Sequence, residues 1–100
     1  MDKTSTISWI FFAVALASEK SPVSFNEISN VADGINHAVP NHKEIQDSIS
    51  WLLSKKLVLK TSKKYELSEL GKKIIINART ESNLILDIWK KLDIELLKLN

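Results

Sequence analysis

A helix start that leads directly into a hairpin pattern is the feature that most constrains the fold of this 100-residue chain. Pro40 ends the preceding segment, and Asn41 with Glu44 three residues later has the pattern of an N-cap and capping box. Four apolar residues then recur at helical spacing: Ile45, Ile49, Leu52 and Leu53. One face of this helix is therefore predicted to be buried and the opposite face exposed.

The residues after this helix change from helical to extended periodicity. Leu57–Lys60 is a β-favouring run, Thr61–Lys64 is polar, and Tyr65–Leu67 alternates again. This pattern predicts a β-hairpin with lysines near its tip. Ser68 then offers an N-cap for a helix that begins at Glu69.

A second capped helix is predicted upstream. Ser24 and Glu27 have the spacing of a capping box, and an apolar stripe follows them in a helix that ends near His37. Residues 37–40 then become the turn of a helix-turn-helix. The predicted fold class is mainly α with a small β-hairpin, in a chain long enough for one domain.

With these elements in place, the chain resembles the winged helix-turn-helix regulators of bacteria and archaea, broadly the MarR-like and PadR-like groups. The resemblance covers residues 21–76, and its most specific part pairs Ile49–Val58 (ISWLLSKKLV) with Lys64–Gly71 (KYELSELG). We therefore expect a winged-helix domain over residues 1–76, followed by a C-terminal helical segment over residues 77–100 to which we assign dimerisation below. The resemblance also implies that the helix starting at Asn41 enters the DNA major groove, with the hairpin (the wing) on the DNA backbone.

Two departures from the family pattern are visible. The family usually has glycine just before the first strand of the wing, where a helix ends in a left-handed residue, and this chain has Lys56 there. The presumed recognition helix also contains no arginine, and Glu44 and Asp47 accompany Lys43. Bidentate reading of guanine by arginine is therefore not expected.

The net charge of +2 is unevenly distributed along the chain. Residues 1–40 carry two lysines and four acidic residues (−2), residues 41–73 carry eight lysines and four acidic residues (+4), and residues 74–100 carry four of each sign (0). The positive excess lies in the helix-and-hairpin segment, as expected for a nucleic-acid surface. The alternative is an ordinary solvated lysine-rich face.

The predicted partner is double-stranded DNA, which the exposed helix face and the hairpin would contact. Gln46 has the chemistry to read adenine, whereas Ser50 is less specific. The hairpin lysines are expected to add affinity more than sequence preference. Trp51 lies between the two helix faces, where it either packs or touches DNA. The predicted DNA-binding residues are Asn41, His42, Lys43, Gln46, Ser50, Lys60, Thr61, Ser62, Lys63 and Lys64.

An apolar segment near the N-terminus, Ile7–Ala17, has two interpretations. Lys3, the apolar run and its Ala15–Ala17 end imitate a secretory signal peptide. Against export, the apolar residues form two helical stripes, as expected for a helix that is buried on two sides. The segment is also too short to span a membrane. We therefore expect a buried first helix, no membrane partner and a cytoplasmic location.

The C-terminal part is predicted to be helical, because no proline or glycine follows Gly71. A polar stretch at residues 77–83 predicts a bend or break, with Thr80 or Ser82 capping a second helix. This last segment is apolar on more than one side, which favours a homodimer built from it and the first helix. The alternative is that both faces pack within one chain. The predicted dimer-interface residues are Trp9, Phe12, Leu16, Ile85, Ile88, Trp89, Leu92 and Leu96.

The sequence offers little for catalysis or metal binding. It contains no cysteine, and His37 and His42 have no acidic cluster at ligand spacing. Gly34 and Gly71 cannot form a phosphate-binding loop, and no nucleophile motif is present. We therefore predict no enzymatic activity, no cofactor and no metal site.

Two functions are compatible with these patterns. The first is a small dimeric DNA-binding regulator of transcription that occupies a palindromic site. The second is a protein–protein interaction module with the same fold, favoured by Glu44 and Asp47 on the helix that would otherwise read DNA. Fold alone does not decide between them.

Overall fold

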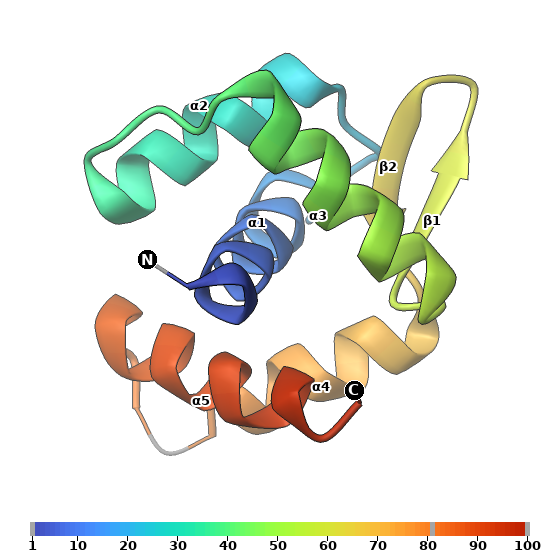
Figure 1. The fold of residues 1–100 in the computed structure, drawn as a ribbon. Coiled ribbons are helices and arrows are strands. Elements are labelled where there is room, and N and C mark those ends of the chain that lie inside the picture. The colour runs from blue at the N-terminus through green and yellow to red at the C-terminus, as the bar shows by residue number, and fades with distance from the viewer. Residues whose placement is uncertain (1, 81, 100) are drawn as a thin grey trace.

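The computed structural model describes residues 2–80 and 82–99 (Figure 1). In chain order, the elements within these ranges are α1 (Lys3–Ala17), α2 (Phe25–Asn36), α3 (His42–Ser54), β1 (Val58–Thr61), β2 (Lys64–Leu67), α4 (Glu69–Ala78) and α5 (Ile85–Leu97). The two strands form one antiparallel sheet. The prediction of a mainly helical chain with a small hairpin is confirmed.

The helix α1 lies at the centre of the molecule, with α2 and α3 on one side and α4 and α5 on the other (Figure 1). All its residues from Ile7 to Ala15 are buried. The Trp9 indole N–H donates to the Ala32 carbonyl oxygen of α2 at 2.8 Å. The apolar segment thus forms the predicted core helix. No helix in the described ranges is long and apolar enough to cross a membrane.

The predicted N-caps are present as hydrogen bonds. The Asn41 side chain accepts from the Glu44 N–H at 2.7 Å, and the Glu44 carboxylate accepts from the Asn41 N–H at 2.9 Å. Ser24 and Glu27 form the same reciprocal pair at the start of α2, and Ser68 caps α4. These bonds satisfy N–H groups that a helix start would otherwise leave unpaired, so they fix where α2, α3 and α4 begin.

Helix α3 ends at a lysine with an unusual backbone conformation. Lys56 has a φ of 60°, in the left-handed region. Its N–H donates to the Leu53 carbonyl at 3.0 Å, and the Leu57 N–H donates to the Leu52 carbonyl at 3.0 Å. This pair of bonds is the Schellman arrangement. Helix α3 therefore ends in a left-handed residue although glycine is absent, and the lysine side chain adds a steric cost to that conformation.

The hairpin tip is a tight two-residue turn. β1 and β2 pair from Val58↔Leu67 to Thr61↔Lys64, which leaves Ser62 and Lys63 as the connecting residues. Their φ values are 50° and 65°, the geometry of a type I′ turn. The predicted hairpin is confirmed.

A third backbone segment pairs with the hairpin, which the sequence analysis missed. Val23, just before α2, forms an antiparallel bridge with Tyr65 on the edge of β2 away from β1. The Val23 N–H donates to the Tyr65 carbonyl at 2.9 Å, and the Tyr65 N–H donates to the Val23 carbonyl at 2.7 Å. This bridge ties the hairpin to the start of α2.

The helical structure is interrupted between Ala78, the last residue of α4, and Ile85, the first residue of α5, as the polar stretch predicted. The N-cap of α5 is Leu84 rather than Thr80 or Ser82, although the Ser82 hydroxyl accepts from the Leu84 N–H at 3.0 Å. The boundary expected after residue 76 falls inside α4, and α5 packs along α1. Helix α5 therefore packs on the helices that precede it, α1 and α4.

A polar network joins α5 to α1. The Ser5 hydroxyl donates to one Asp93 oxygen at 2.9 Å, and the hydroxyl of the fully buried Ser8 donates to the other. The Trp89 indole N–H lies 3.1 Å from both the Ser5 carbonyl oxygen and the Ser8 hydroxyl oxygen. The Trp89 ring also stacks on Trp9, with ring centres 6.2 Å apart. The network fixes the register of α5 along α1.

The predicted dimer-interface residues are mostly used within the single chain. The prediction was wrong for five of them, which are buried in the core: Trp9, Phe12, Ile88, Leu92 and Leu96. Leu16 and Trp89 are partly buried against the same core, and only Ile85 is exposed. The physical reason is that α1 covers the inner face of α5. The alternative that both faces pack within one chain holds for this inner face only, because Leu86, Ile94 and Leu97 are exposed on the outer face.

Candidate nucleic-acid interface

The helix α3 buries one face and exposes the other, as its spacing predicted. Ile45, Ser48, Ile49 and Leu52 are buried. The opposite face exposes Lys43, Gln46, Asp47 and Ser50. This outer face is the part of α3 that a macromolecule can reach.

Asn41 and His42, two predicted contact residues at the start of α3, also make contacts within the chain. The Asn41 side chain is held by the N-cap bond described above, so its orientation is fixed along the helix axis. The His42 ring lies 5.7 Å from the Phe25 ring. Both residues remain exposed, and they can offer edges to a partner without changing their packing.

An aromatic cluster connects the start of α3 to the hairpin. The Phe25 ring stacks on Tyr65 of β2 with centres 5.2 Å apart, and it also contacts His42. The Lys60 ammonium lies 5.8 Å from the centre of the Tyr65 ring, a cation–π distance. Sequence spacing did not reveal this cluster, because it joins three elements that are distant along the chain. Through this cluster, the start of α3 and the hairpin belong to one continuous surface.

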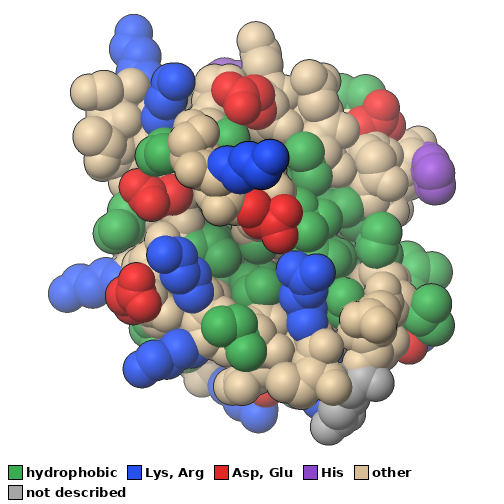
Figure 2. Space-filling view, turned by 180° about the vertical axis from the view of Figure 1, so that it is seen from behind, with side chains coloured by type: hydrophobic (Ala, Val, Ile, Leu, Met, Phe, Trp, Pro, Cys, Tyr) green, Lys and Arg blue, Asp and Glu red, His purple; other side chains and the backbone are tan. Residues whose placement is uncertain are grey.

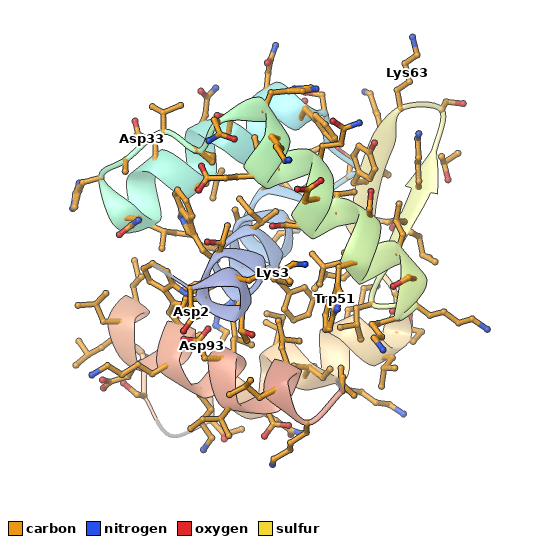
Figure 3. All side chains as sticks on the ribbon, in the orientation of Figure 1. Asp2, Lys3, Asp33, Trp51, Lys63 and Asp93 are labelled. Carbon is orange, nitrogen blue, oxygen red and sulfur yellow. The ribbon has the colours of Figure 1, made fainter. Side chains whose placement is uncertain are left out.

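The exposed residues of the hairpin are those the sequence predicted. Lys60, Thr61, Ser62, Lys63 and Lys64 are all exposed. Lys63 projects from the tip, away from the helices (Figure 3). Because the turn residues are held by left-handed backbone geometry, the lysines at and beside the tip are presented on a short, defined loop.

The acidic residues of α3 lie on the flank away from the aromatic cluster. Glu44, Asp47 and Ser48 line a cavity of about 200 Å³ together with Lys3, Thr6 and Ile7 of α1. Gln46 follows His42 by about one turn, and so lies on the flank that faces the cluster. Glu44 and Asp47 therefore lie along the side of α3 that is nearer to the start of α1 than to the hairpin.

Trp51 packs against the core instead of standing free on the outer face. In Figure 3 it lies on the side of α3 nearer to α4 and α5. The Lys55 ammonium lies 5.7 Å from the centre of its ring. Of the two roles open to this residue, the structure favours packing.

The described residues contain no group of three or more metal-binding side chains. Comparisons with protein-family models, with curated proteins and with solved structures found no match for this chain.

Proposed function

We propose that the chain is a winged helix-turn-helix protein that binds double-stranded DNA and regulates transcription. One observation carries the proposal. The aromatic cluster of Phe25, His42 and Tyr65 connects the start of α3 to the lysine-bearing hairpin, while Glu44 lies on the flank of α3 that faces α1. A helix face and a basic hairpin side by side suit a major groove and its neighbouring phosphates.

In this account the two elements have different tasks. α3 enters the major groove, where Gln46 and Ser50 reach base edges and Lys43 reaches a phosphate. Lys60, Lys63 and Lys64 of the hairpin bind the sugar-phosphate backbone, with help from the hydroxyls of Thr61 and Ser62. The lysines supply affinity for any sequence, and α3 supplies the sequence preference.

The protein acts as a homodimer through the outer face of α5 in this account. Leu86, Ile94 and Leu97 are exposed at 62%, 56% and 55%, and their spacing places them on the side of the helix away from α1. Asp87 and Lys98 flank the two ends of this stripe, where each already has a partner in its own chain: Ser82 for Asp87 and Glu95 for Lys98. A two-fold dimer presents two α3 helices to two half-sites.

A protein-interaction module is the second candidate. The exposed Asp47 and the absence of arginine from α3 favour it, because both weaken attraction to phosphate. In that case the outer face of α3 binds a protein, and the hairpin lysines are a solvated surface.

Fluorescence anisotropy with a labelled random duplex distinguishes the two candidates. The Lys63→Ala/Lys64→Ala variant is expected to bind every duplex more weakly and to lower the salt dependence by about one unit per lost contact. The control is Lys72→Ala/Lys73→Ala, which removes the same charge from exposed positions of α4. Equal losses in the two variants would show that only net charge matters, and would count against the proposed surface.

A further inference from the structure

A cavity of about 420 Å³ lies between the C-terminal end of α1, β2 and α4. Its base is apolar, because Ala15, Leu67 and Ile75 line it and are themselves buried. Charged side chains of both signs surround it: Glu19, Lys20, Glu66, Lys72 and Arg79. Figure 2 shows the side of the molecule opposite to the view of Figure 1, on which Lys, Arg, Asp and Glu side chains are interspersed with hydrophobic ones.

The edge of β2 at this cavity has an unused pair of backbone groups. Neighbouring residues of an antiparallel strand direct their N–H and C=O groups to opposite edges. Tyr65 bonds to Val23 on one edge, and the Ser68 N–H bonds to the Leu57 carbonyl on the other at 2.9 Å. Leu67 therefore faces the same edge as Tyr65, where no described residue outside the hairpin bonds to its backbone.

The cavity exists because the third strand is so short. Val23 forms the single bridge to β2, and residues 18–22 leave the strand edge and become the opposite wall of the cavity. A backbone segment inserted there would continue the pairing that the chain itself begins at Val23.

We propose that this cavity binds a short extended peptide, which pairs with the Leu67 backbone and places an apolar side chain on the base. Addition of a strand to a free sheet edge is a common mode of peptide recognition, with backbone bonds for affinity and a pocket for specificity. The rim has three basic and two acidic side chains. The basic side chains can bind the carboxylate end of a peptide, and the acidic ones can bind its amino end. A polyanion would instead be repelled by the two carboxylates.

One ion pair across the rim can open to admit the peptide. Arg79 lies 3.8 Å from Glu19, and their side chains are 45% and 61% exposed. An exposed pair of this kind contributes little to stability, so its exchange for a peptide carboxylate is inexpensive.

The peptide site does not rest on the proposed DNA binding. No residue proposed to contact DNA lines this cavity. A failure of one proposal therefore leaves the other unaffected.

The test is an NMR titration of the ¹⁵N-labelled chain with the tripeptide Ala-Leu-Ala. The amides of Leu67, Glu66 and Ser21 are expected to shift most, and the Leu67 amide is expected to exchange more slowly. Ile76→Glu, on the cavity wall at a 63% exposed position, is expected to weaken binding about ten-fold. The control Leu70→Glu is also exposed on α4, does not line the cavity and should leave the affinity unchanged.

Hexanoate separates peptide recognition from simple binding of an apolar anion, because it has an apolar chain and a carboxylate but no peptide bond. Weaker binding of hexanoate, without protection of the Leu67 amide, supports the proposal. Equal binding of hexanoate, shifts that persist in Ile76→Glu, or no shifts at millimolar tripeptide would each overturn it.

Discussion

A Cβ atom on Gly71 would lie 2.2 Å from the carbonyl oxygen of Leu57. The same oxygen accepts the Ser68 N–H at 2.9 Å. The start of α4 is thus pressed against the residue that opens the hairpin, and only a residue without a side chain fits. This contact gives a physical reason for the glycine in the KYELSELG segment.

Gly71→Ala is expected to destabilise the protein by about 2–3 kcal/mol, because the added methyl group displaces a hydrogen-bonded backbone. Gly34→Ala is the matched control. Gly34 lies in α2 with nothing within 4 Å of an added Cβ, so alanine there should stabilise by about 0.5–1 kcal/mol. Urea denaturation measures both, and a similar effect at the two positions would contradict the packing described for Gly71.

Lys56→Gly is expected to stabilise the protein by about 0.5–1 kcal/mol. Glycine avoids the steric cost of the left-handed conformation, which is about 1–2 kcal/mol for other residues. Part of this gain is lost because glycine has more backbone entropy in the unfolded chain. Lys55→Gly, one residue earlier at a φ of −89°, should instead destabilise. Thermal unfolding of the two variants checks the opposite signs.

The buried bond between Ser8 and Asp93 is expected to couple α1 to α5 energetically. Ser8→Ala should destabilise by about 1–3 kcal/mol, because it removes a hydroxyl on which both Asp93 and Trp89 rely. Ser54→Ala, which removes an exposed hydroxyl bonded to the Trp51 carbonyl, should cost no more than about 0.5 kcal/mol. A double-mutant cycle with Asp93→Ala tests the coupling, and purely additive effects would show that the two residues act independently.

Ile94→Glu/Leu97→Glu is expected to convert a dimer into a monomer, because it places charges in the proposed apolar stripe of α5. Light scattering coupled to gel filtration measures the mass. Leu70→Glu, at an exposed position of α4, should leave the dimer intact. A parent chain that is monomeric at the concentrations used for DNA binding would refute this interface.

Local chemistry made much of the fold predictable. The capping boxes at Ser24 and Asn41 and the hairpin each depend on residues close together in sequence. The bridge at Val23 was missed because a single pair has no period to detect. The aromatic cluster around Phe25 was missed because its members are brought together only by the tertiary fold.

The dimer-interface residues show a different limit of sequence reasoning. Apolar periodicity identified the residues of α5 that are expected to be buried. It could not show whether they are buried against a second chain or against α1. The hydrogen bonds of Ser5 and Ser8 to Asp93 hold the inner face of α5 against α1 of the same chain. Polar contacts of this kind have no periodic pattern in the sequence. The outer face of α5 stays exposed, and it is the surface that we propose for the dimer.

The most direct test of the account is the salt dependence of binding to duplex DNA, measured by fluorescence anisotropy between about 50 and 200 mM salt. The four proposed phosphate contacts, Lys43, Lys60, Lys63 and Lys64, predict that log K falls linearly with log salt concentration, with a slope of about −3 to −4 for each subunit. Absence of binding even near 50 mM salt, where phosphate contacts are strongest, would contradict the proposed function and leave the outer face of α3 to a protein partner.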